Sequence, residues 1–489
     1  VVANTLDLAQ TGYDLIFNGG GTITSAVTFD NTGTLNLGNA AGASFTFNGG
    51  LTETTTGTVT LASAISSSND AISFVSVTLV ANTIIDTNAT ANAADITVAA
   101  ITGGSNNLTL STGDSITGAD ITASGAISGL GNLTLADVGG TATFSANVAA
   151  AALSAANTVA NITFTGSTNT FSAASTLAND GTLTFGNATG DSFTFNGGLN
   201  TSSVAGTVTL NTSISSSNDA MVFGAITLGN NVTLDTNASN TTGDLTLGVV
   251  TGGSNTLTLS TGDNVADSDI TASGNISGVT ALTLQDVGGT ATLSGDVDVT
   301  TLNVGNTVAN VAFTGNGSSV ANAVAFANDG TLILGVNGGT QTYNGGLNTA
   351  SVGGTVTLNG TVATSNDAVV LGAVTLGSAT TIDTNATNTT GDITIAAITG
   401  GSNNLTLSTG NNIANADTTA SGAISGLGNL TLADVGGTAT FSNNVAAAAL
   451  SAANTVANIT FTGSTNTFSA ASTLANDGTL IFGNATGDS

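Results

Sequence analysis

The chain has 489 residues, 65 of them Gly, and a formal charge of −29, because it contains 29 acidic residues and no Lys, Arg or His. Without His, Lys or Cys there is no Ser–His or Cys–His pair and no Schiff-base lysine, so we expect no enzyme activity. Without Lys or Arg we also expect no binding to nucleic acid, which depends on cationic neutralisation of phosphates, and none to an anionic membrane surface.

Hydrophobic residues make up 40% of the chain, enough to form a core if they recur in a regular order. The most apolar stretch, 148–156, is too short to cross a bilayer. The sequence starts without an initiator Met or a basic segment, so no signal peptide is visible. We expect that the chain has been cut from a longer repetitive protein.

The chain repeats itself with a period of about 148 residues, which indicates a repeat architecture. The segment Asn-Gly-Gly-Leu ends at Leu51, at Leu199 and at Leu347. We expect one continuous solenoid over 1–489 rather than several globular domains. The copies of the repeat are 1–51 (partial), 52–199, 200–347 and 348–489 (nearly complete).

Within a copy, short runs alternate Thr or Asn with Leu, Ile, Val or Phe, the pattern of a half-buried strand. Gly, Asn, Asp and Ser clusters separate the runs, as at turns, and the density of Gly, Thr and Asn disfavours helix. The runs follow one another about every 21 residues, a length that suits one turn of a parallel β-solenoid. In chain order the clearest runs are 34–37, 58–61, 77–79, 107–110, 132–135, 161–164 and 182–185.

We therefore predict an all-β chain, folded as a parallel β-solenoid with rungs of roughly 21 residues and two or three short strands per turn. About 23 turns would stack at the usual strand spacing of about 4.8 Å, with apolar rows inside and ladders of Asn and Thr between turns. The alternative is a row of β-sandwich domains, one per copy. It is disfavoured because no linker separates the copies and the spacing of the runs is long for hairpins.

Two repeated segments resemble a known family. The segments 107–114 (NLTLSTGD) and 131–141 (GNLTLADVGGT), with their copies, are similar to repeats of giant bacterial surface proteins, namely filamentous-haemagglutinin-like and autotransporter-like β-solenoid adhesins. The resemblance covers essentially the whole chain. It implies a right-handed β-helix that bacteria secrete, and an extracellular or cell-surface location.

Asp residues that recur beside strands are the candidate metal ligands. Carboxylates and turn carbonyls suit Ca²⁺, so calcium is the one candidate cofactor. The interpretation that we favour is that each Asp accepts hydrogen bonds from its own turn. No calcium-binding loop motif occurs, so we assign no catalytic, cofactor-binding or metal-binding residue. These Asp residues are Asp70, Asp219 and Asp367; Asp86, Asp235 and Asp383; and Asp137, Asp286 and Asp434.

Two further observations raise functions that we disfavour. The pairs Asp267/Asp269 and Asp296/Asp298 are the nearest approach to an acidic cluster, and paired carboxylates can hydrolyse glycosides. Neither pair recurs in the other copies, and no Trp or cationic residue is present to hold a sugar. Rows of Thr could order water at an ice surface, but we expect the Thr positions to drift between turns.

The function that we expect is a non-catalytic extracellular structural fibre or filament shaft that associates with copies of itself, end to end or laterally. The alternative is the rod-like stalk of a surface adhesin whose binding tip lies outside this segment. Because chains of this charge repel one another, we expect lateral bundling to need divalent cations or high salt. The lack of Lys and Arg leaves trypsin-like proteases no cleavage site, which suits an exposed fibre.

Overall fold

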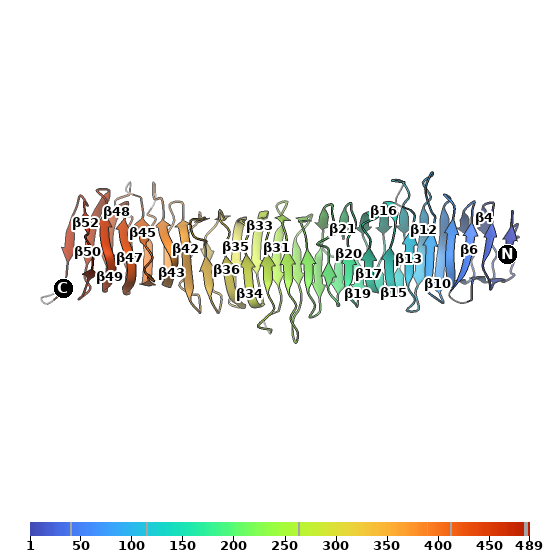
Figure 1. Ribbon diagram of the computed structural model, residues 1–489, viewed down its shortest axis with the longest axis horizontal. Coiled ribbons are helices and arrows are strands. Elements are labelled where there is room, and N and C mark those ends of the chain that lie inside the picture. Colours follow the sequence, from blue (N-terminus) through green and yellow to red (C-terminus); the bar gives the residue numbers. More distant parts are fainter. Residues whose placement is uncertain (40–41, 114–115, 263–264, 389, 411–412, 484–487) are drawn as a thin grey trace. The chain divides into compact units, whose positions relative to one another are not determined.

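Strands make up the regular structure of the described part of this chain. The computed structural model contains 53 strands and no helix among the residues that it describes (Figure 1). It falls into an N-terminal half, Val1–Asn237, and a C-terminal half, Ala238–Ser489. The described residues are 1–39, 42–113, 116–262, 265–388, 390–410, 413–483 and 488–489. Asp114, the last residue of the segment 107–114, lies outside them.

Each half is a parallel β-solenoid, which confirms the predicted fold class. About 22 turns of about 21 residues are present in the two halves together. Each turn contributes up to three strand segments, and each segment pairs in parallel with the equivalent segment one turn further along the chain. The alternative of β-sandwich domains is therefore wrong, because sandwiches are built from antiparallel sheets. The right-handed coil, and the division into copies along one continuous solenoid, stay predictions.

In the N-terminal half the paired segments form three columns, a, b and c, in chain order around the turn. Column a contains β1 (Val2–Ala3), β3 (Gly21–Ile23), β6 (Ala43–Phe47), β9 (Ser63–Ser67), β11 (Thr83–Asp86), β13 (Leu108–Ser111), the second parts of β15 (Ile127–Leu135) and β17 (Val148–Ala155), β20 (Ser175–Leu177), β23 (Leu199–Asn200) and β26 (Met221–Phe223). Column b contains β4 (Val27–Phe29), β7 (Leu51–Glu53), the first parts of β10 (Ile72–Leu79) and β12 (Ile96–Thr102), β14 (Ile121–Ala123), β16 (Val138–Phe144), β18 (Val159–Phe164), β21 (Leu183–Phe185), β24 (Val208–Leu210) and β27 (Ile226–Leu228). Column c contains β2 (Leu15–Phe17), β5 (Leu35–Leu37), β8 (Val59–Leu61), the remaining parts of β10, β12, β15 and β17, β19 (Thr168–Phe171), β22 (Ser192–Phe195), β25 (Ser213–Ser216) and β28 (Val232–Asp235).

The C-terminal half likewise has three columns, d, e and f, in chain order. Column d contains β29 (Leu245–Leu247), β32 (Ile270–Ala272), β34 (Val287–Leu293), β36 (Val308–Phe313), β39 (Leu332–Leu334), parts of β42 (Val356–Ala363), β43 (Val369–Asp383), β44 (Ile393–Thr399), β47 (Ile424–Leu432) and β49 (Val445–Ala452), and β51 (Thr467–Phe468). Column e contains β30 (Val250–Thr251), parts of β33 (Ile276–Leu284) and β35 (Val297–Val304), β37 (Ser319–Val320), β40 (Thr340–Tyr343), parts of β42, β43, β47 and β49, β45 (Leu405–Ser408) and β52 (Thr473–Leu474). Column f contains β31 (Thr256–Ser260), parts of β33, β35, β43 and β44, β38 (Val324–Ala325), β41 (Leu347–Asn348), β46 (Thr418–Ala420), β48 (Val435–Phe441), β50 (Val456–Phe461) and β53 (Leu480–Phe482).

The 148-residue repeat is not a whole number of turns. In the N-terminal half, Leu51 lies in column b, whereas its equivalent Leu199 lies in column a. In the C-terminal half, Ile270 lies in column d, whereas its equivalent Thr418 lies in column f. In both halves the equivalent strand has moved back by one column out of three. Each copy is therefore displaced around the coil by about a third of a turn relative to the copy before it.

The core is built from the inward side of the alternating runs. Leu, Ile, Val and Phe at these positions are almost fully buried, and the same position on the next turn is in most cases again apolar, as where Ile162 pairs with Leu183. Phe144 and Phe164, which pair directly between β16 and β18, stack with their ring centroids 4.8 Å apart. Phe441 and Phe461 repeat this contact at the same distance. Stacking in rows thus removes these apolar side chains from contact with water.

One core position departs from its copies in a way that tests this packing. Thr418 is fully buried and its hydroxyl has no hydrogen-bond partner, whereas the equivalent residues Ile121 and Ile270 are buried apolar side chains. We predict that Thr418→Ile stabilises the C-terminal half by about 1–2 kcal/mol, because it removes an unsatisfied hydroxyl and adds apolar contact. Thermal or denaturant unfolding measures the change.

The matched control is the reverse change, Ile270→Thr, which should destabilise the same half by a similar amount. A lower stability for Thr418→Ile would contradict the inward placement of this side chain.

Candidate functional site

The structure places the Asp of the Asp-Thr-Asn segments in hydrogen-bonded turns. Asp86 accepts a hydrogen bond through Oδ1 from the backbone amide two residues further on, over a distance of 2.9 Å. Asp235 and Asp383 accept the equivalent bond at 2.9 Å and 3.0 Å. The donor residue has a positive φ in all three copies, 48° in the first. These Asp residues therefore have the turn geometry that we favoured. The hydrogen bond stabilises a turn whose donor residue has a left-handed backbone conformation.

The other two sets of recurrent Asp residues contribute mainly through the backbone. The carbonyl oxygens of Asp70, Asp219 and Asp367 accept hydrogen bonds from Ser or Thr hydroxyls three residues earlier in the chain. The carbonyl of Asp137 accepts the amide of Thr112 from the preceding turn at 2.7 Å, and Asp286 and Asp434 accept equivalent bonds. The carbonyls of the first set therefore accept bonds from within the same corner, and those of the second set link neighbouring turns.

Within the part of the chain that the structure describes, neither Asp pair forms an acidic cluster with a third carboxylate. Asp269 Oδ1 accepts the amide of Thr290 at 2.7 Å, and Asp296 Oδ1 accepts the amide of Gly317 at 2.7 Å. Their partners Asp267 and Asp298 are exposed. Among the described residues, no group of three or more His, Cys, Asp or Glu side chains could hold a metal ion together. Calcium stays a candidate without an assigned site.

A ladder of Asx side chains links successive turns; its Asn-to-Thr steps match the ladders of Asn and Thr that we expected, whereas its Asp members were missed by the sequence reasoning. Asp95 Oδ1 accepts the amide of Asp120, one turn on, at 2.9 Å, and Asp120 Oδ1 accepts the amide of Thr141 at 2.7 Å. Further along, Asn161 Oδ1 accepts the amide of Thr182 at 2.9 Å. A Cβ atom on Gly140 would lie 2.1 Å from Asp120 Oδ1, so this glycine makes room for the carboxylate.

The ladder recurs in both later copies. The spacing of 25 and then 21 residues between its members is the signal that could have revealed it, because each step is one turn. The equivalent bonds link Asp244, Asp269 and Thr290, then Asn310 and Thr331, and again Asp392, Asp417 and Thr438, then Asn458 and Thr479.

The expectation that Thr positions drift between turns is wrong for column b. Its central outward position holds a hydroxyl residue on ten successive turns, and every neighbouring pair is in register. The drift seen in the sequence comes from insertions in the loops, which leave the strand register unchanged. One copy later in the repeat, the equivalent positions in the C-terminal half lie in column d. There Ala312 and Ile333 replace two of the hydroxyl residues. The ten residues of the Thr column are Thr28, Thr52, Ser73, Thr97, Thr122, Thr143, Thr163, Thr184, Thr209 and Thr227.

The single Glu of the chain is buried. Glu53 is 1% exposed; its Oε2 accepts the amide of Val75 at 3.0 Å, and its Oε1 has no hydrogen-bond partner. Burial raises the pKa of this carboxyl above its ordinary value, and the bond from Val75 offsets part of the rise. The equivalent residues in the next two copies are the buried Thr201 and Thr349.

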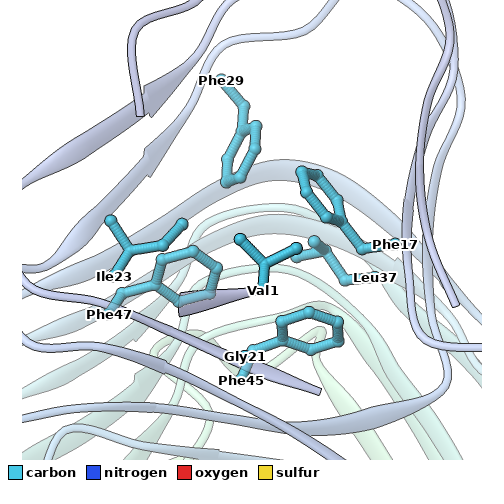
Figure 2. Close-up of a pocket in the computed structure, with 8 residues that line it drawn as sticks. All are labelled: Val1, Phe17, Gly21, Ile23, Phe29, Leu37, Phe45 and Phe47. Atoms are coloured by element: carbon cyan, nitrogen blue, oxygen red, sulfur yellow. The ribbon is translucent and has the colours of Figure 1, made fainter. Parts of the chain in front are cut away.

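An apolar pocket lies within the first turns of the N-terminal half. Figure 2 shows the side chain of Val1 among the rings of Phe17, Phe29, Phe45 and Phe47. The remaining lining residues, Gly21, Ile23 and Leu37, are also apolar. With no polar side chain in its wall, the pocket has nothing to orient a polar substrate.

Comparison with known proteins adds no family to this description. No family model, no curated protein and no solved structure matches the chain. No helix long and apolar enough to cross a membrane occurs among the described residues. The chain is a β-solenoid repeat protein, and its chemistry has to be judged from its own residues.

Glu53 predicts a pH-dependent difference between variants. Because its pKa is raised in the fold, the protonated side chain is favoured, so stability is highest below the unfolded pKa and is lost as the pH rises through the folded pKa. We therefore expect Glu53→Gln to be more stable than the parent chain at neutral pH, with the difference vanishing in acid. Denaturant unfolding of both chains across this pH range measures it.

Glu53→Thr, which introduces the residue of the other copies, is the control that also removes the carboxyl. A parent chain that gains stability relative to Glu53→Gln as the pH rises would contradict the cause given for the shift.

Proposed function

We propose that this chain is the shaft of an extracellular structural fibre and that it does no catalysis. The observation that carries the proposal is the displacement of successive copies around the coil. Equivalent polar side chains of successive copies therefore lie beside different columns. They are not brought together in one site, as catalytic residues have to be. Stacked parallel turns with continuous apolar rows suit a load-bearing role.

The composition supports an exposed location. Across the whole sequence there is no Lys or Arg, so trypsin-like proteases have no cleavage site, and no Cys is present to be oxidised. The charge of −29 has no side-chain cation to balance it. Neighbouring chains therefore repel each other, and lateral association is favoured by divalent cations that screen or bridge the carboxylates.

Surface labelling tests the proposal directly. Antibodies raised against this chain should decorate filaments on intact, unpermeabilised cells in immunogold electron microscopy. In isolated filaments, chelation at low ionic strength should separate lateral bundles, and added Ca²⁺ or Mg²⁺ should restore them.

Labelling that requires permeabilised cells would contradict the extracellular fibre. Bundles that survive chelation in low salt would contradict the role of cations between chains, while leaving the fibre itself in place.

The alternative is a stalk that presents an adhesive tip outside this segment. The same solenoid would serve as a spacer, so the distinction lies in the parent protein. Deletion of a terminal domain with the solenoid retained should abolish adhesion if the chain is a stalk, whereas a structural fibre should retain its assembly.

The Thr column favours a second candidate, a face that orders water at an ice surface. Its ten hydroxyls repeat at the strand spacing of about 4.8 Å, and β-branched side chains in strands have few rotamers, so their positions are well defined. On the turns of Thr143, Thr184 and Thr209 another Thr stands two residues earlier on the same face.

This candidate predicts inhibition of ice recrystallisation by the folded chain. Thr163→Ala together with Thr184→Ile, the residues found at Ala312 and Ile333 of the next copy, should weaken the inhibition several-fold. The matched control places Ser154→Ala and Thr176→Ile on column a, where no such effect is expected. Equal loss in both double variants, or no inhibition by the parent chain, would reject the ice-binding face.

A further inference from the structure

An interior corner of the solenoid carries the same unsatisfied atoms in two copies of the repeat. Asn179 and Thr201 are fully buried, and neither Asn179 Oδ1 nor Thr201 Oγ1 has a hydrogen-bond partner. One copy later, Asn328 Oδ1 and Thr349 Oγ1 are buried and unpartnered in the same way. Orphaned buried oxygens are rare, and their recurrence at equivalent residues indicates a common cause.

The orientation of the Asn side chain is determined by its nitrogen. Asn179 Nδ2 donates to the carbonyl oxygens of Ala160, Gly181 and Thr182 at 3.1–3.3 Å. Asn328 Nδ2 donates to three equivalent carbonyls at 2.9–3.3 Å. Rotating the amide by half a turn would place its oxygen against these acceptors, so Oδ1 is the atom that faces the corner and needs a donor.

The Asn and the Thr belong to one corner on neighbouring turns. The amide of Val204 donates to the carbonyl of Thr201, and the amide of the next residue, Ala205, donates to the carbonyl of Asn179 at 3.1 Å. The next copy has the equivalent bonds: the amide of Val352 donates to the carbonyl of Thr349, and the amide of Gly353 donates to the carbonyl of Asn328. The loop that starts at the Thr therefore returns to the backbone of the Asn.

The turns of Asn31 and Thr55 show what meets the Asn oxygen when a protein group is available. Asn31, the equivalent of Asn179, is also fully buried, and its Oδ1 accepts a hydrogen bond from the Thr55 hydroxyl at 3.3 Å. The loop from Leu51 to Val59 is one residue shorter than the loop from Leu199 to Val208. Counted back from these valines, Val204 stands where Thr55 stood, so the hydroxyl has been lost.

We propose that an ordered water molecule replaces this hydroxyl in each of the two later copies. The water donates a hydrogen bond to the Asn oxygen and accepts one from the Thr hydroxyl, so both orphaned atoms are satisfied. A metal cation is the wrong ligand, because the corner offers two neutral side-chain oxygens and no carboxylate, whereas Ca²⁺ takes six to eight oxygen ligands. The site is independent of the fibre function and of the candidate cation between chains.

A structure of the full 489-residue chain at a resolution that shows ordered water tests the proposal. We expect one density peak within hydrogen-bond distance of Asn179 Oδ1 and Thr201 Oγ1, and a second at Asn328 Oδ1 and Thr349 Oγ1. No peak is expected between Asn31 Oδ1 and the Thr55 hydroxyl, which are bonded directly, although Glu53 Oε1, at the position of Thr201, has no partner there. In the variant Thr201→Val the first peak should disappear or fall strongly in occupancy while the second is unchanged.

Several results would overturn the site. They are empty density at both corners, a peak that keeps full occupancy in Thr201→Val, or a peak with six or more oxygen neighbours at the short distances of a cation. If Thr201→Val does not fold, the comparison of the two later corners with the Asn31 corner in the parent chain still decides the question.

Discussion

The stacking of one turn on the next constrains every other feature of this chain. A parallel segment can donate and accept backbone hydrogen bonds only if the segment of the next turn lies in register with it. A side chain at a given position therefore meets the side chain at the same position one turn later, as Phe144 meets Phe164. Apolar rows, Thr rows and Asx corners are three consequences of this single rule, according to whether the position faces inward, outward or a bend.

The same rule explains how the chain manages without salt bridges. With no Lys or Arg, its carboxylates cannot be paired with side-chain cations. Instead, Asp86 is bonded to an amide of its own turn, and Asp120 to an amide of the next turn. Backbone N–H groups at corners are donors that the columns leave unused, and a carboxylate is a strong acceptor for them. The price of this arrangement is an uncompensated negative charge along the whole chain.

Much of the fold could be predicted from the sequence, because the alternation of Thr with Leu or Phe and the spacing of about 21 residues both reflect a single turn. What could not be predicted depends on register. The ten-residue Thr column is hidden because turns differ in length by several residues, so hydroxyls that stack, such as Thr184 and Thr209, are unevenly spaced along the chain. The bond between Asp95 and Asp120 was missed for the same reason. The burial of Glu53 was missed because the Thr residues on either side of it look alike in sequence, so the sequence does not show which side chain faces inward.

The displacement of the copies connects this register to function. A repeat that filled a whole number of turns would place every copy of a segment in one column and give that column a chemistry of its own. Here Leu51 and Leu199 fall in columns b and a, and Ile270 and Thr418 in columns d and f. Differences between columns must then arise from divergence of individual residues, such as Ala312 and Ile333 where the copy 52–199 has Thr163 and Thr184. Such an arrangement favours uniform chemistry around the coil, with a specialised face only where a run of turns keeps the same residue type, as in the Thr column.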